Sequence, residues 1–469
     1  VAVLRNGLNF TDLRDWIYVT YEVTCDGRPI ISGEREMVEL PSIPPHDTGN
    51  VILPVPKVFL DDGSRRGRGD GTFGRVMPER GKCFLKLQYY LKCDAGPLAA
   101  GLELGFDEVP LVNGDGRNQD VVRMEQKMSL ARSVSGYDMA SLHARANGPD
   151  MASLHDGIDG SGVAGIFGMP GVRDASRMDR VSEDDRFLTI CTRRFTYVYD
   201  KLRGAFHSME MGNEKLLDRP MEFEIWRAPT DNDRQLKLEW LKAGYDKART
   251  RAYETDCGWT DGRVQIHSEI GLVTVSRQRI LDMDATWEID TNGNLSLDVT
   301  AKRNLEFPEL PRFGLCLYLP REMGYVTYCG LGPMESYRDK HHASSHGIYQ
   351  ADVERLHEDY LRPQENGSHF DCDYVVLEGG GHKLTAFGGM VSNGTSPGTE
   401  TFSFNASVYT TEELTNKAHN YELEPCGSTV LHLDAAQNGI GSNSCGPRLK
   451  KKYRFDDGEF SFVIRMLVE

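Results

Sequence analysis

The chain has 469 residues and a mass of 52.6 kDa, which is too large for one ordinary domain and predicts two or three. An apolar fraction of 39% allows a real core, but no apolar run approaches the roughly 18 residues that a membrane span needs, so we expect a soluble protein without membrane contact. With 70 acidic against 54 basic residues, the formal charge of −16 argues against a surface for nucleic-acid phosphates.

The ten cysteines lie far apart and include no Cys-x-x-Cys pair. This spacing fits neither a zinc site nor a disulfide-dense scaffold, so we expect reduced thiols in a cytoplasmic protein. The chain begins Val1-Ala2-Val3, with no methionine and no signal-peptide pattern, which indicates a piece of a longer protein.

Short segments of alternating polar and apolar residues fill residues 1–113 and predict an immunoglobulin-like β-sandwich. The predicted strands are residues 16–23, 51–55 and 83–91. A Gly- and Arg-rich stretch at 63–75 contains Arg68-Gly69-Asp70. We interpret this stretch as a hairpin loop, and an adhesion module built on the tripeptide is the alternative.

Residues 114–182 change in composition to Gly, Asp, Ser, Arg and Met without periodicity, which predicts a partly disordered insertion or linker. Within it, residues 138–143 recur as residues 150–155. The period is too short for a repeat fold. A metal site on His143 and His155 is disfavoured, because neither has a rigid frame.

Alternating segments return at residue 183 and continue to the end, which predicts one large two-sheet domain and an all-β fold class. The predicted strands include residues 187–190, 195–199, 264–266, 273–275, 287–290, 295–299 and 402–408. Only residues 236–243 and 411–419 look helical, and Thr410 or Thr411 is suited to cap the second helix.

Five segments of this last region resemble signature segments of one family, in the family's order. They are WRAPTDNDR (226–234), GLGPMESYRD (330–339), PQENG (363–367), FSFNAS (402–407) and GIGSNSCGP (439–447). They are similar to the last domain of the large β-galactosidases of glycoside hydrolase family 2. Residues 1–113 resemble the sandwich that precedes that domain. The resemblance therefore implies an immunoglobulin-like sandwich followed, over residues 183–469, by a galactose-mutarotase-like supersandwich, with residues 114–182 as an insertion.

This resemblance implies a C-terminal fragment or a separately encoded small subunit of a retaining β-galactosidase, which hydrolyses terminal β-D-galactose residues. In the family, the catalytic glutamates and the magnesium ligands belong to an earlier (β/α)8 barrel, and nothing here resembles such a barrel of about 250 residues. We therefore expect no catalytic residue, no metal ligand and no cofactor in this chain. The implied partners are the barrel of the same enzyme, the β-galactoside substrate and further copies in a homo-oligomer.

The resemblance also places one loop of the last domain, with Asn443, Ser444 and Cys445, at the mouth of the barrel. Bacterial members have a tryptophan at the position of Cys445, which stacks on the sugar beyond galactose. A thiol has no stacking face, so we expect weaker or different binding there, or simply a small residue that lets the loop turn. The other motif residues are expected to be structural or interdomain: Arg227, Asp231, Asn232, Asp233, Glu335, Tyr337, Glu365 and Asn366.

Hydrolysis by a retaining glycosidase needs two carboxyl groups about 5 Å apart, and no pair in the sequence is shown to converge. Glu222 and Glu224 share one face of a predicted strand, where we expect solvent exposure. Residues 231–233 suit a tight polar turn after Pro229. A group of histidines and acids at 341–346 and 369–373 has a metal-like composition but matches no zinc signature.

An alternative function is a stand-alone carbohydrate-binding or aldose-mutarotase-type protein. In that case His369 and Glu365 would act as acid and base on the concave sheet.

Overall fold

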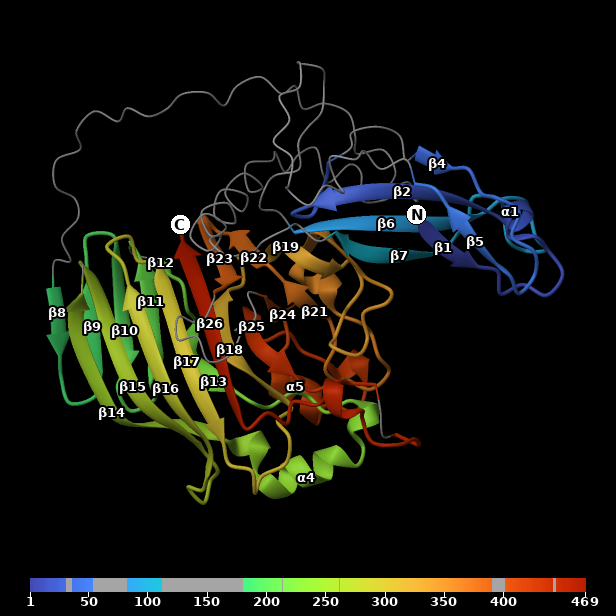
Figure 1. Cartoon of the computed structure of the whole chain (residues 1–469). Helices are drawn as coiled ribbons and strands as arrows, with labels where there is room; N and C mark the ends of the chain where they lie inside the picture. The colour runs from blue at the N-terminus through green and yellow to red at the C-terminus, as the bar shows by residue number, and fades with distance from the viewer. Residues whose placement is uncertain are drawn as a thin grey trace, which may run out of the picture. The chain divides into compact units, whose positions relative to one another are not determined.

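The computed structural model describes residues 1–30, 36–53, 82–111, 180–212, 214–260, 262–389, 401–441 and 444–469. These residues fall into two compact units, the first within residues 1–111 and the second within residues 180–469. Both units consist mainly of antiparallel strands (Figure 1), which confirms the all-β fold class. The Arg68–Asp70 tripeptide, the repeat at 138–155 and Asn443 lie outside the described residues.

In the first unit a β-sheet packs over a small core. Its main sheet has the order β3-β2-β6-β7, with β4 also paired to β2, and a two-stranded sheet pairs β1 with β5. The elements are β1 (Ala2–Arg5), α1 (Leu13–Trp16), β2 (Ile17–Cys25), β3 (Arg28–Pro29), β4 (Glu36–Val38), β5 (Thr48–Val51), β6 (Cys83–Leu91) and β7 (Glu103–Leu111). Alternate residues of β2 form the core, and the turn to β3 at Asp26-Gly27 has positive φ at both residues, as a tight hairpin requires.

The expectation that every cysteine is reduced was wrong for one pair. Cys25 at the end of β2 and Cys83 at the start of β6 form a disulfide that spans 58 residues. The two residues are direct cross-strand partners in the sheet. Sequence separation alone gave no sign of this, because the pairing depends on how β2 aligns with β6.

The second unit contains three sheets in its described residues. One has the order β12-β11-β10-β9-β8, a second β13-β18-β25-β24-β21, and a nine-stranded sheet β14-β15-β16-β17-β26-β23-β22-β19-β20. The strands are β8 (Arg180–Glu183), β9 (Phe187–Cys191), β10 (Phe195–Asp200), β11 (Ala205–Met211), β12 (Glu214–Lys215), β13 (Arg219–Glu224), β14 (Arg249–Thr260), β15 (Arg263–Val273), β16 (Arg279–Ile289), β17 (Leu295–Arg303), β18 (Arg312–Pro320), β19 (Tyr325–Gly332), β20 (Ser345–Asp352), β21 (Ser368–Cys372), β22 (Tyr374–Gly379), β23 (His382–Gly388), β24 (Phe402–Ser407), β25 (Ser428–Gln437) and β26 (Glu459–Val468).

Aromatic contacts show how the two five-stranded sheets pack against the nine-stranded one. Phe206 of β11 meets Trp287 of β16 edge to face, with ring centroids 5.0 Å apart. Phe313 of β18 meets Phe460 of β26 at the same centroid distance. These side chains belong to one continuous buried core, so the second unit is a β-sandwich, but its described residues form three sheets and not the expected two.

The structure contains α1, which the sequence did not predict. Both predicted helices are present, although the second ends at Asn416 and not at His419. They are α4 (Leu236–Ala243) and α5 (Thr411–Asn416), with short 3₁₀ helices η2 (Asp231–Asp233), η3 (Tyr245–Lys247), η4 (Val353–Leu356), η5 (Asn420–Glu422) and η6 (Lys451–Tyr453). The Thr410 side chain accepts the Glu413 amide at 3.1 Å and so caps α5.

Two predicted strands were wrong in their described residues. Of residues 51–53, only Val51 is in a strand, because β5 ends there, and residues 54–55 lie outside the described part of the chain. Residues 273–275 do not form a strand of their own, because β15 ends at Val273 and the chain turns toward β16. The amide of Arg277, which has a φ of 66°, donates to the carbonyl oxygen of Thr274 inside this turn. The β-branched run therefore reflects the end of a strand and the start of its hairpin.

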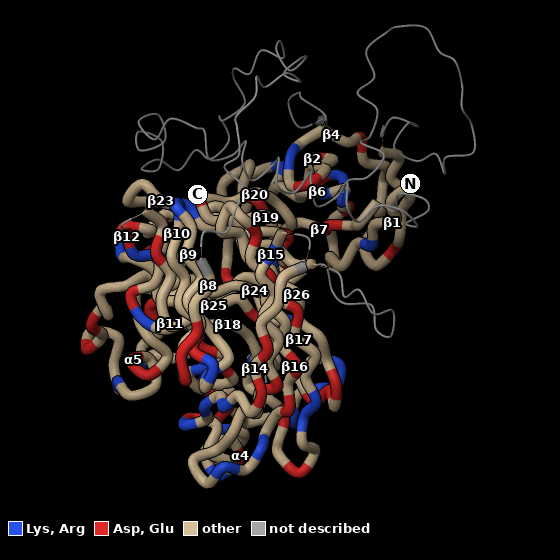
Figure 2. Tube along the Cα trace, turned by 90° about the vertical axis from the view of Figure 1, so that its left-hand side faces the viewer, with Lys and Arg blue, Asp and Glu red and all other residues tan. Residues whose placement is uncertain are grey.

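Acidic and basic residues are interspersed along the strands of the second unit (Figure 2). Over the described part of the chain, no helix has the length and apolar character needed to cross a bilayer.

Candidate functional site

Arg227 holds the stem of the loop that leads to Cys445. We call residues 438–441 the loop stem. The Arg227 side chain is completely buried and pairs with Asp233 at 2.9 Å. Its guanidinium also donates to the carbonyl oxygens of Asn438 at 2.5 Å and Gly439 at 3.1 Å. A buried guanidinium with these partners fixes the backbone of the stem in one position.

The polar turn after Pro229 is built to hold Arg227 and the stem together. It forms η2, in which the Asp233 carboxylate accepts the Thr230 amide at 2.9 Å while it pairs with Arg227. The Asn232 side-chain amide donates to the carbonyl oxygen of Ile440 at 2.8 Å. Residues 231–233 therefore link the first motif segment to the stem through backbone contacts.

The second motif segment reaches the same stem from another side, through Asp339. Its two carboxylate oxygens accept the backbone amides of Ile440 at 3.0 Å and of Gly441 at 2.8 Å. A Cβ added at Gly439 or Gly441 would lie 2.7–2.8 Å from this carboxylate, closer than such atoms approach. The glycines of the GIG sequence thus let the backbone come close enough to be held by Asp339.

Glu365 occupies the centre of a buried charge network next to this stem. Arg312 pairs with Asp434 through two hydrogen bonds of 3.0 and 2.5 Å, and it contacts Glu365 at 3.4 Å. The Tyr337 hydroxyl lies 3.4 Å from the other Glu365 oxygen. Burial raises the pKa of Glu365, although the charges of Arg312 and Arg227 oppose this shift.

Glu335 holds the third motif segment, residues 363–367, in place. It forms an ion pair with Lys340 and a hydrogen bond with Tyr360, and it accepts the Gly367 amide at 2.9 Å. Burial lowers the pKa of Lys340, but the contacts with Glu335 and Tyr360 outweigh this and raise it. Asn366, one residue earlier, accepts the Asn405 side-chain amide at 2.5 Å through its carbonyl oxygen.

The five motif segments thus form one continuous set of contacts, which we call the motif cluster: residues 226–234, 330–339, 363–367, 402–407 and the stem 438–441. The first and third segments are joined directly, since the Glu365 amide donates to the Ala228 carbonyl oxygen at 3.0 Å and the Asp231 amide donates to Gln364 at 3.0 Å. Beyond the stem, Ser444 is half-buried and Cys445 is exposed.

Glu224 does not lie free in solvent as the sequence suggested. It pairs with His432 at 2.9 Å, on a strand two places away in the sheet. Burial raises its pKa, but the hydrogen bond and charge of His432 outweigh burial and lower it. Glu222 is exposed, as expected, at the edge of a cavity.

His369 is placed unfavourably for the alternative acid–base role. It is buried against the rings of Tyr328 and Phe404, with centroid distances of 4.3 and 5.1 Å, and burial lowers its pKa to about 4. No hydrogen bond or ion pair among the described residues joins it to Glu365. The pair proposed for a mutarotase-type reaction is therefore not assembled in this structure.

Two groups of potential metal-ligating atoms occur among the described residues: Glu224, Cys316 and His432, and Cys329, His346 and Asp373. The second group brings together parts of the histidine-rich and acidic segments, with His346 and Asp373 2.7 Å apart. Each group includes a thiol, a soft ligand that does not suit magnesium, which prefers oxygen. The described residues thus offer no fitting magnesium site of this kind.

Comparison with known proteins now assigns these segments to a family. A family model described as beta-galactosidase small chain matches residues 192–466, and one described as beta-galactosidase domain 4 matches residues 2–112. A beta-galactosidase of Actinobacillus pleuropneumoniae is 34% identical over 468 residues, which cover 100% of this chain. The chain belongs to the β-galactosidase small-chain family.

The chain spans 38% of the length of the Actinobacillus protein. A beta-galactosidase of Staphylococcus xylosus is 34% identical over 61% of the chain and 28% of its own length. Among solved structures, a galactose 1-epimerase of Lactobacillus acidophilus NCFM covers 60% of the chain and 94% of its own length, with a TM-score of 0.33 and 9% identity. A likeness of this size carries no information about activity.

The sequence identified most of the motif cluster but not the contacts within it. Asp339 lies in a recognised segment, yet nothing in the sequence showed that its carboxylate meets the loop stem 102 residues away. Arg312 and Asp434 lie outside the five segments and gave no signal. No strand was predicted at either residue, so the sequence offered no indication that the two side chains meet.

Proposed function

We propose that this chain is a C-terminal part or small subunit of a β-galactosidase and that its loop around Cys445 forms part of the rim of the substrate pocket. The observation that carries this proposal is the motif cluster. Two buried or partly buried carboxylates, Asp233 and Asp339, and one buried guanidinium, Arg227, are used to hold the stem of a loop whose tip is exposed. Such a support suits a loop that must meet a partner surface in a fixed position.

The catalytic carboxylates and the magnesium ion belong, in this proposal, to a (β/α)8 barrel that the described residues do not provide. The carboxylates of the motif cluster support this division, because they are engaged in structural pairs: Asp233 with Arg227, Glu365 with Arg312, and Glu335 with Lys340. A general acid or nucleophile has to face its substrate, and Glu365 is 4% exposed.

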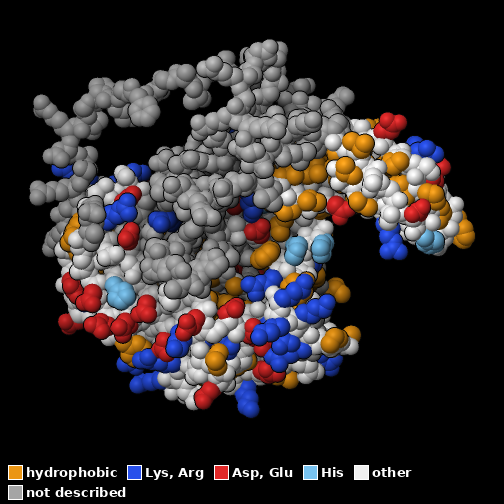
Figure 3. Space-filling view, viewed as in Figure 1, with side chains coloured by type: hydrophobic (Ala, Val, Ile, Leu, Met, Phe, Trp, Pro, Cys, Tyr) orange, Lys and Arg blue, Asp and Glu red, His pale blue; other side chains and the backbone are white. Residues whose placement is uncertain are grey.

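The first unit offers a surface for the remainder of the enzyme. Several large apolar side chains are exposed on it: Val3, Phe10, Met37 and Ile52, at 68%, 94%, 70% and 77%. The space-filling view shows hydrophobic side chains gathered over this unit (Figure 3). A partner would cover these exposed apolar side chains, and we assign the barrel-bearing part of the enzyme as that partner.

A reconstitution assay tests the proposal. The 469-residue chain, a polypeptide that carries a β-galactosidase barrel, and their mixture are each incubated with a chromogenic β-galactoside. We expect no hydrolysis by the chain alone and more by the mixture than by the barrel polypeptide alone. Hydrolysis by the purified chain alone, abolished by Glu222→Gln or Glu365→Gln, would place catalytic residues in this chain and contradict the proposal.

A further inference from the structure

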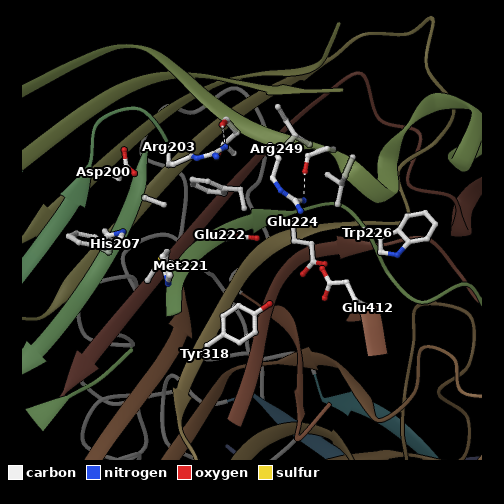
Figure 4. Close-up of a pocket in the computed structure, with 18 of the residues that line it drawn as sticks. Asp200, Arg203, His207, Met221, Glu222, Glu224, Trp226, Arg249, Tyr318 and Glu412 are labelled. Carbon is white, nitrogen blue, oxygen red and sulfur yellow. Dashed lines mark hydrogen bonds between the residues drawn. The ribbon is translucent and has the colours of Figure 1, made fainter. Parts of the chain in front are cut away.

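A cavity of about 240 Å³ lies in the second unit beside β13, an end strand of its sheet (Figure 4). The cavity is bordered by the turn between β10 and β11, by β13, by the start of β14, by β18 and by α5. No described residue of the loop stem lines it. The cavity therefore offers a ligand a place that the motif cluster does not already fill.

Opposite charges line the two sides of this cavity. Glu222, Glu224 and Glu412 lie on one side, and Arg203 and Arg249 lie on the other, together with Asp200, which is paired with Arg186 (Figure 4). The view shows the Arg249 guanidinium directed toward the side that holds the carboxylates. Among the residues that the structure describes, no ion pair joins one of these glutamates to Arg203 or Arg249. The opposing groups thus remain available to a molecule between them.

The two arginines are positioned by the backbone. Arg203 donates to the Thr250 carbonyl oxygen at 3.1 Å, and Arg249 donates to that of Ala248 at 2.9 Å. Each of these bonds uses one of the five N–H donors of a guanidinium, so each arginine retains donors for a ligand.

Of the three glutamates on the carboxylate side, one is in an ion pair and two are available to a ligand. Glu224 is paired with His432, whereas Glu222 and Glu412 have no ion pair among the described residues. Although the Glu222 side chain is open to solvent, its partial enclosure at the cavity edge raises its pKa, the charges of Glu224 and Glu412 raise the pKa further, and Arg249 opposes them. A ligand that donates hydrogen bonds to Glu222 would stabilise its charged form against the repulsion of Glu224 and Glu412.

These walls select for a neutral ligand with several hydroxyl groups. An ionised carboxylate only accepts hydrogen bonds and a guanidinium only donates them, whereas a hydroxyl does both. An anion would face the glutamates and a cation would face the arginines. The ring of Tyr318 and the edge of Trp226 add apolar surface that suits the C–H groups of a sugar ring.

We propose that this cavity binds one monosaccharide unit, held between Glu222 and Glu412 on one side and Arg203 and Arg249 on the other. Its volume is below the roughly 300–1,000 Å³ of sites for drug-sized ligands, which fits a single sugar ring. The choice of D-galactose as the probe rests on the proposed function, because that reaction releases galactose. The existence of the site rests on the cavity alone.

Calorimetric titration of the 469-residue chain with D-galactose tests this proposal. We expect saturable binding, weakened about tenfold or more by Glu222→Gln and by Arg249→Met, since each removes a charge-assisted hydrogen bond. Glu254→Gln and Arg251→Met are matched controls on β14, outside the cavity, and should bind like the unaltered chain. Thermal unfolding of all four variants checks that they are folded.

Three results would overturn the proposal: no saturable binding of galactose, equal weakening in the control variants, or loss of binding in Cys445→Trp with the cavity variants unaffected. Binding of glycine betaine in place of galactose would also overturn it, because that result identifies a zwitterion site. The titration requires no hydrolysis. Failure of the reconstitution assay therefore leaves this result interpretable, and failure of the titration leaves the proposed function standing.

Discussion

The carboxylate of Asp339 accepts the backbone amide of Gly441 at 2.8 Å, and the absence of a side chain at Gly441 is what allows this approach. One residue earlier, the Ile440 amide donates to the other oxygen of the same carboxylate, and the Ile440 carbonyl oxygen accepts a hydrogen bond from Asn232. Two motif segments that lie about a hundred residues apart in the sequence therefore hold the backbone of Ile440 from both sides.

The Arg227–Asp233 pair should be a major source of stability for the second unit. Arg227→Met leaves the Asp233 carboxylate buried without its partner, and we expect the free energy of unfolding to fall by about 3–5 kcal/mol. Chemical denaturation of the variant measures this loss. Arg263→Met breaks an exposed pair with Glu288 and is the control, with an expected change of about 0–1 kcal/mol. Equal losses of unfolding free energy in both variants would contradict the claim that the buried pair is a major source of stability.

The identity of residue 445 should affect acceptor binding and leave folding unchanged. In the complete enzyme, Cys445→Trp adds a stacking face on an exposed loop, so we expect a changed KM for a disaccharide substrate. Cys257→Trp, at another exposed cysteine, is the control. Steady-state kinetics with a disaccharide and with an aryl galactoside separate an effect on binding of the second sugar from a general effect on activity. Unchanged constants for both substrates would remove the pocket role of this loop.

His369 should make the second unit less stable in mild acid. Burial lowers its pKa from 6.5 to about 4, so between these values the unfolded chain binds a proton that the folded chain does not. The free energy of unfolding therefore decreases as the pH falls from about 6.5 to about 4, by roughly 3 kcal/mol for this group. His369→Phe removes the titrating group and should flatten the curve over that range. Denaturation at several pH values tests this, and a slope unchanged from that of the exposed-site control His419→Gln would contradict it.

The Cys25–Cys83 bond should be detectable by counting thiols. Alkylation of the denatured, unreduced chain should label eight cysteines, and labelling after reduction should reach all ten. Because the bond closes a loop of 58 residues, its removal in Cys25→Ala/Cys83→Ala should lower the stability of the first unit by about 2–4 kcal/mol. Ten labelled thiols without reduction would show that the two sulfurs are not joined.

Local features were predictable from the sequence, and long-range partners were not. The helix at 236–243 follows from local periodicity, the cap at Thr410 follows from side-chain preference, and both are found. The pairing of Glu224 with His432 joins residues 208 positions apart and depends on the order of β13, β18 and β25 in their sheet. Alternation of residue types predicts that a strand exists but not which strand lies next to it.

The motif segments illustrate the same limit within the site. Their order along the chain led to the family, but they are separated by strands whose register decides which side chains meet. Arg312 and Asp434 were missed because neither lies in a motif segment or a predicted strand, and they meet only when β18 and β25 are paired. The sequence therefore indicates which segments matter, and the fold shows that they hold one loop.

Hydrogen–deuterium exchange over residues 438–446 is the most direct test of the claim that the motif cluster holds this loop in place. In the unaltered chain, the amides of Ile440 and Gly441 should exchange slowly, because both are bound to Asp339. Asp339→Asn should speed their exchange, whereas Asp457→Asn, at an exposed position, should not. Rapid exchange at both amides in the unaltered chain, or no difference between the two variants, would contradict this account of the site.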